Sequence, residues 1–222
     1  MESTKNNYTW KGIVFGFLLG IIAGVISPLG VEFFKLQFFS PDIEFKFEAK
    51  SPYVISTVFG IDEIREYFSV IEFRFLIENT SKHHSADSYS VMLTGLWHKE
   101  GESFVSSKNF EPIKLRQYPY MPSSISPGMR IFVPFARIAH PDYQKKFDSK
   151  LYSGNPEIPQ FRFQVPNYPR WMSSHVEPGI HRFQITVFFD NRPPVSKMFE
   201  FQWPEKRVFS DILSNIRINM KS

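Results

Sequence analysis

Histidines and nearby carboxylates are the residues of this chain that could ligate a metal or transfer protons, and their spacing favours neither role. His83 and His84 are adjacent in a polar turn that also holds Asp87. Adjacent histidines rarely direct both rings at one ion, and no second cluster stands at ligand spacing. We therefore expect solvated loop histidines and no metal site. The other four histidines are scattered along the chain.

Motifs for nucleophilic or phosphate chemistry are missing from the sequence. The chain has no cysteine, which excludes disulfides, thiolate nucleophiles and cysteine-ligated zinc. It has no Gly-x-Ser-x-Gly turn, no glycine-rich phosphate loop and no marked pair of carboxylates for glycoside hydrolysis. These features predict a protein that is not an enzyme and binds no cofactor.

Two aromatic, proline-rich stretches, 117–121 and 164–171, are the best candidates for a binding surface. Tyr and Trp on rigid loops give contact area for a protein or a glycan at little entropic cost. In the alternative interpretation, the same rings cover one end of the fold as a small satellite core. The candidate surface consists of Tyr118, Tyr120, Tyr168, Arg170 and Trp171.

The segment Gly12–Val31 predicts that the candidate surface is held near a membrane, because its twenty residues carry no charge. A helix of this length reaches about 30 Å, the thickness of the hydrocarbon core of a bilayer. We expect an uncleaved membrane-spanning helix that continues to residue 39. A cleaved signal peptide is the alternative, but its apolar region would be shorter and Ser27-Pro28-Leu29 is a poor cleavage site.

Glycine recurs at every fourth position of this segment, at Gly12, Gly16, Gly20 and Gly24. Residues four apart share one helix face, so another helix could approach this face closely. The pattern favours a helix–helix interface with a second copy or with another membrane protein. Glycine is also common in spanning helices that form no such interface.

Charge sets the expected orientation and excludes one class of partner. Lys5 and Lys11 precede the apolar segment, whereas the charges after it are roughly balanced. This bias predicts a cytoplasmic tail over 1–11 and an extracytoplasmic domain. The net charge of +4 is too small to predict binding of nucleic acid.

Short runs in which apolar and polar residues alternate predict a β-rich domain over 41–204. In 68–79 (FSVIEFRFLIEN) one face holds Ile71, Phe73, Phe75 and Ile77 and the other holds Glu72, Arg74 and Glu78, which is typical of a strand with one buried face. Pro134 indicates an edge strand or a bulge, and Pro141–Leu151 is a candidate short helix. Strands are expected at 42–49, 54–59, 68–79, 89–98, 103–115, 129–138, 179–189 and 195–203.

Two motifs carry a resemblance to a known class of domain. One is the strand, Asn-x-Ser turn, loop and strand at Phe73–Leu93, and the other is Pro-Gly-x-x-x-Phe-x-Ile-x-Val at Pro178–Val187. Both resemble the immunoglobulin-like β-sandwich repeats of prokaryotic cell-surface proteins. The resemblance covers about 41–204 and implies an all-β sandwich, without implying a function.

The tail, 205–222, has apolar residues at helical spacing and an excess of basic residues. It predicts an amphipathic helix that packs on the sandwich or lies on a membrane or a partner.

Together these features predict a membrane-anchored, non-catalytic interaction or accessory module of a membrane protein assembly. The alternative is a surface module that binds a glycan or a peptide through its aromatic loops.

Overall fold

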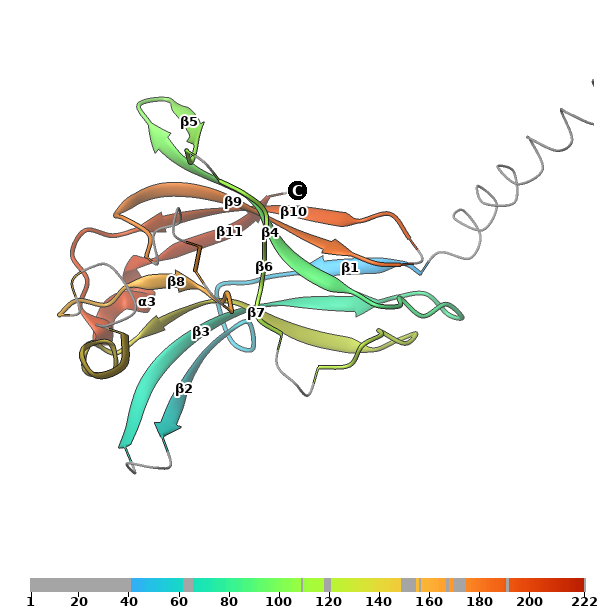
Figure 1. The fold of residues 1–222 in the computed structure, drawn as a ribbon, viewed down its shortest axis with the longest axis horizontal. Helices are drawn as coiled ribbons and strands as arrows, with labels where there is room; N and C mark the ends of the chain where they lie inside the picture. The colour runs from blue at the N-terminus through green and yellow to red at the C-terminus, as the bar shows by residue number, and fades with distance from the viewer. Residues whose placement is uncertain are drawn as a thin grey trace, which may run out of the picture. The chain divides into compact units, whose positions relative to one another are not determined.

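The computed structural model describes residues 41–61, 66–108, 110–117, 121–148, 155, 157–166, 168–169, 175–190 and 192–221. Strands dominate these ranges and form two antiparallel sheets, which confirms the predicted all-β class (Figure 1). Residues Pro41–Ser222 make up one compact unit. No helix in the described ranges has both the length and the apolar character needed to cross a bilayer, and Gly12–Val31 lies outside these ranges.

The first sheet is built around one long strand, β3, because β3 has neighbours along both of its edges. On one edge β1 pairs with the C-terminal end of β3 and β2 pairs with its N-terminal half. On the other edge β3 pairs with β7, and β7 pairs with β8. The strands are β1 (Ile43–Lys46), β2 (Val54–Ile61), β3 (Glu66–Asn79), β7 (Arg130–Ala139) and β8 (Phe161–Phe163).

The second sheet has the order β11-β10-β9-β4-β5, and β6 also pairs with β4. Its two central strands, β4 and β9, are far apart in the sequence. The strands are β4 (Ser90–Glu100), β5 (Ser103–Ser106), β6 (Ile113–Lys114), β9 (Gly179–Phe188), β10 (Val195–Trp203) and β11 (Arg217–Lys221).

The two sheets share one aromatic core. Phe135 of β7 lies 5.5 Å from Phe183 of β9 and 5.4 Å from Phe199 of β10, measured between ring centroids. All three rings are fully buried. Each buried phenylalanine stabilises the fold by about 2–3 kcal/mol through removal of apolar surface from water. The core therefore explains most of the phenylalanine content of the domain.

The predicted irregularity at Pro134 is a bulge. The register of β3 with β7 shifts so that Phe73 pairs with Ala136 and Arg74 pairs with Pro134, which leaves Phe135 as the extra residue. β8 pairs with β7 only at Ala136–Ile138, so Pro134 lies both at the bulge and on the part of β7 whose second edge β8 leaves unpaired.

Two segments between the strands differ from the prediction. The strand expected at 103–115 ends at Ser106, where the chain turns, and resumes only at Ile113–Lys114. The helix expected at Pro141–Leu151 begins as α2 (Pro141–Tyr143) and continues as a π-helical turn, η1 (Gln144–Asp148). The short strand β8 was not predicted, because three residues between prolines give no readable alternation.

The helix predicted over 205–222 is wrong for most of its length. A 3₁₀ turn, η2 (Phe209–Asp211), leads into the short helix α3 (Ile212–Asn215), and the chain then forms β11. Ile216 and Ile218 alternate with Arg217 and Asn219, and pairing with the edge of β10 buries both isoleucines. Filling a sheet edge satisfies more backbone groups than one short helix would.

Candidate functional site

Of the five residues of the predicted aromatic surface, Tyr168 lies within the described residues. Its hydroxyl donates a hydrogen bond to the carbonyl of Phe163 at 2.7 Å, and its half-buried ring packs against the core. Tyr118, Tyr120, Arg170 and Trp171 lie outside the described residues, as do Gly12, Gly16, Gly20 and Gly24.

The histidine turn behaves as a loop in the structure. The rings of His83 and His84 lie edge to face with centroids 6.5 Å apart. No group of three His, Cys, Asp or Glu in the described ranges could hold a metal ion.

A projecting arm, which we define as β2 together with Glu66–Val70 of β3, is the most exposed apolar feature of the first sheet. In Figure 1 the arm projects at the lower left, away from the strands of the second sheet. The side chains of Val58 and Tyr67 are 60% and 68% exposed. Val58 pairs with Ser69 and Gly60 pairs with Tyr67, so Val58 and Tyr67 are diagonal neighbours on one face.

This apolar face of the arm is the continuation of the core face of the sheet. Tyr67 and Ser69 stand in the same alternation as Ile71 and Phe73, which are buried in the core. The opposite face of the arm is covered, because Phe68 packs against Tyr143 with ring centroids 5.6 Å apart. The arm is therefore an amphipathic sheet edge whose core-facing side lacks a cover among the described residues.

The free edge of the arm also lacks the usual protection. β2 pairs with β3 and with no other described strand, so half of its backbone N–H and C=O groups point outward. No residue of β2 is charged and none is proline. By contrast, the edge strand β1 carries Glu44 and Lys46, and β11 carries Arg217 and Lys221. Charges and proline are the common means of blocking edge-to-edge pairing.

A small hollow extends this surface at the base of the arm. It has a volume of about 140 Å³ and is lined mainly by apolar residues, including Val54 and Phe73 of the arm's sheet and Ile216 and Ile218 of the chain end. Leu213 of α3 also lines the hollow and is 46% exposed. The exposed apolar surface therefore runs from the arm onto α3.

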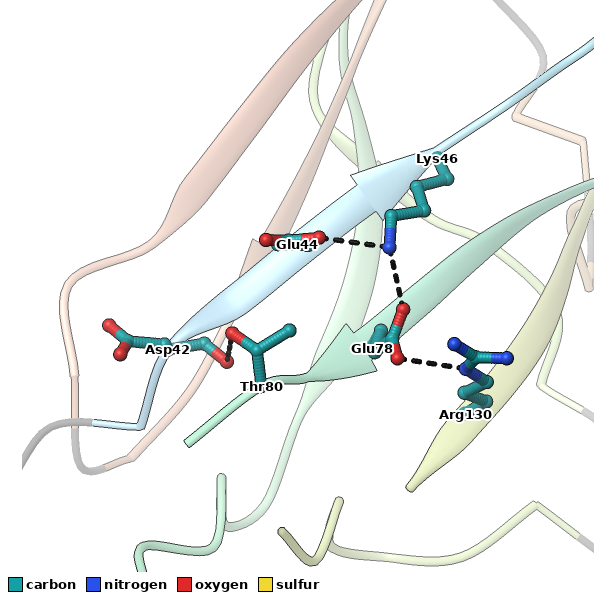
Figure 2. Close-up of polar contacts among 6 residues, drawn as sticks. All are labelled: Asp42, Glu44, Lys46, Glu78, Thr80 and Arg130. Atoms are coloured by element: carbon teal, nitrogen blue, oxygen red, sulfur yellow. Dashed lines mark hydrogen bonds and ion pairs between the residues drawn. The ribbon is translucent and has the colours of Figure 1, made fainter. Parts of the chain in front are cut away.

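The best-defined charged cluster lies on the outer face of the same sheet and has a structural role (Figure 2). The carboxylate of Glu78 accepts hydrogen bonds from Lys46 Nζ at 2.7 Å and from Arg130 Nε at 2.8 Å, and Lys46 also contacts Glu44 at 2.9 Å. These contacts join β1, β3 and β7. The backbone of Thr80 bonds to the carbonyl of Asp42 at 2.8 Å beside them.

The pKa of Glu78 lies below its ordinary value because Lys46 and Arg130 donate hydrogen bonds to the carboxylate. Such a carboxylate stabilises the fold above the unfolded value near 4.5, and this contribution is lost as the pH falls through the folded value. We expect Glu78→Gln to lower the free energy of unfolding at about pH 7 and to have a smaller effect at about pH 3. Denaturant unfolding of the full-length Glu78→Gln and unmodified proteins in detergent micelles measures the difference in unfolding free energy. An equal difference at both pH values contradicts the prediction.

A second pocket with a mainly apolar lining is at a different place, at one end of the second sheet. Its volume is about 370 Å³. Leu96 and His98 of β4 stand opposite Phe183 and His181 of β9, so the pocket continues the core face of that sheet. Its other walls are formed by residues 175–178 and by Ser107, Lys108 and Phe110.

Sequence reasoning did not find the arm or this pocket. The uncharged stretch from Ser51 to Ile61 was a readable signal for the arm, because edge strands normally carry charge. The pocket gave no such signal, because His98 and His181 are brought together only by strand pairing. No protein-family model, no curated protein and no solved structure matches the chain.

Proposed function

We propose that this chain is a membrane-anchored, non-catalytic interaction module of a membrane protein assembly. In this proposal Gly12–Val31 is the anchor and the β-sheet unit is an immunoglobulin-like domain on the extracytoplasmic side. An extended segment of a partner protein pairs with the free edge of β2. The observation that carries the proposal is an uncharged, unpaired edge strand next to exposed apolar side chains.

Strand addition explains why both features occur in one place. The outward N–H and C=O groups of β2 supply backbone hydrogen bonds to an added strand. Val58 and Tyr67 then supply the side-chain contacts, because every second residue of the added strand faces the same side of the sheet. Leu213 and the hollow beside it give room for one larger apolar side chain of the partner.

The glycine face of the anchor fits the same assembly. Gly12, Gly16, Gly20 and Gly24 would allow the anchor to pack against a spanning helix of the partner. Once one of these two contacts has formed, it holds the partner close to the other and so raises the partner's effective concentration there. Neither contact therefore has to be strong alone.

The test places a photoreactive benzoylphenylalanine at Tyr67 in the full-length chain and crosslinks it in native membranes. We expect one specific adduct, and mass spectrometry should map the crosslink to an extended apolar segment of another protein. Val58→Lys should reduce the adduct about tenfold, because a lysine on the edge opposes strand addition.

Val105→Lys is the matched control, because Val105 is an exposed valine of the edge strand β5 and lies outside the arm. It should leave the adduct unchanged. Equal losses with both variants, or an adduct that survives Val58→Lys, would contradict the proposal. A crosslink to a second copy of the same chain would mean that the arm binds another copy of this chain and not a different protein.

A further inference from the structure

The pocket at the end of the second sheet combines an apolar floor with a rim that carries an excess of positive charge. Leu96, Phe110, Phe163 and Val176 are apolar lining residues and form what we call its floor. This volume, about 370 Å³, and this composition are typical of sites for small organic ligands.

Glu177 is the carboxylate among the lining residues, and it contacts a histidine of the same lining. His175 Nε2 lies 2.8 Å from Glu177 Oε1, and His98 Nε2 of the lining lies 2.6 Å from Oε1 of the neighbouring Glu100. His181 is 7% exposed, and its Nε2 lies 2.8 Å from the carbonyl oxygen of Glu177. Burial lowers the pKa of His181, which keeps this ring neutral in the folded protein.

The two lysines of the lining are not engaged in this way. Lys99 and Lys108 both line the pocket and have exposed side chains. Neither forms an ion pair with any residue in the part of the chain that the structure describes. Their long, flexible stems allow both ammonium groups to reach an anion at the rim.

We propose that this pocket binds a small organic acid, with its apolar body on the floor and its anionic head group at Lys99 and Lys108. Lys99 and Lys108 outnumber Glu177 among the charged groups of the lining, so the rim favours an anionic head group over a neutral or a cationic one. The site is separate from the arm, so either proposal can fail without the other.

The test uses the full-length chain in nanodiscs of zwitterionic lipid, with empty nanodiscs as the reference. The probe is 3-(4-fluorophenyl)propionate, and its fluorine NMR line width reports binding. The corresponding neutral alcohol, 3-(4-fluorophenyl)propan-1-ol, should bind about tenfold more weakly than the acid, because it forms no charge-assisted hydrogen bond.

Three variants separate the head group from the floor. Combining Lys99→Gln with Lys108→Gln should weaken binding of the acid about tenfold and leave binding of the alcohol unchanged. Lys82→Gln, at an exposed lysine away from the pocket, should change neither. Leu96→Trp, which adds bulk on the core face of β4 within the pocket, should abolish binding of both, and its thermal unfolding shows whether the fold is intact.

Four results would overturn the proposal. These are equal affinities for the acid and the alcohol, unchanged binding of the acid after loss of both lysines, binding that persists in a folded Leu96→Trp protein, and no binding of the acid by the unmodified chain.

Discussion

Phe135→Ala is expected to lower the free energy of unfolding by about 4 kcal/mol, which is a large part of the total stability of a domain of this size. The ring of Phe135 is fully buried and touches five others from both sheets: Phe47, Phe73, Phe75, Phe183 and Phe199. Truncation to alanine leaves a cavity that the surrounding rings cannot close, because each is held by further ring contacts.

Denaturant unfolding followed by near-ultraviolet circular dichroism of the full-length protein in micelles measures this change. Phe188→Ala is the matched control, because Phe188 is on β9 next to the core but is 38% exposed. Its expected cost is about 1 kcal/mol. Similar losses for the two variants would mean that the sheets do not share the core described above.

Asn79→Ala is expected to cost about 3 kcal/mol, although it removes only one small side chain. Asn79 is fully buried, and its amide nitrogen donates to the carbonyls of His84 at 2.8 Å and Ile125 at 2.7 Å. Its amide oxygen accepts from the backbone N–H of Ser81 at 3.1 Å and from the hydroxyl of Ser81 at 2.6 Å. One side chain therefore holds the loop after β3 against the loop before β7.

The large expected cost follows from the loss of four hydrogen bonds at one fully buried side chain. The two carbonyls keep one other donor each, the N–H of Ala86 for Ile125 and the hydroxyl of Ser81 for His84. Asn79→Asp should cost at least as much as Asn79→Ala at neutral pH, because it places a buried carboxylate against these two carbonyl oxygens. Asn219→Ala, at an exposed asparagine of β11, should change the free energy of unfolding by less than about 0.5 kcal/mol. Equal unfolding free energies for Asn79→Ala and the unmodified protein would contradict the role of Asn79.

The long strands could be predicted from sequence because their alternation is strong. Ile71, Phe73, Phe75 and Ile77 are buried as predicted, and the charged residues between them lie on the other face of β3. The pattern works here because the inner face of β3 is continuous with the core. The outer face is only partly solvated, since Val70, Glu72 and Leu76 are also buried.

The prediction failed where long-range pairing decides the structure. Ile212 and Ile216 are both buried at helical spacing, so the tail looked like a helix, but Ile218 and Met220 lie on the same side of a strand paired with β10. The sequence of the tail does not indicate that β10 has an unpaired edge with which it can pair. The three residues of β8 are a strand only because β7 provides an edge for them.

The binding surfaces were harder to predict than the fold, because each depends on which residues the other elements of the domain leave exposed. Val58 and Tyr67 have the spacing of core residues, and only the extent of the second sheet leaves them exposed. Of the predicted aromatic surface, Tyr168 uses its hydroxyl within the fold. Aromatic content alone does not separate a binding loop from a packed one.

The pairing of β4 with β9 has a consequence for how fast the domain forms. The hydroxyls of Thr94 and Thr186, on these two strands, lie 2.7 Å apart although they are separated by 92 positions in the chain. The chain must therefore close a loop of this length before β4 and β9 can form their contacts. Domains dominated by such distant pairs fold in milliseconds to seconds, far more slowly than helical bundles of similar size. During that interval the phenylalanines of the unfinished core are open to other chains, so a newly made molecule depends on being kept apart from its neighbours.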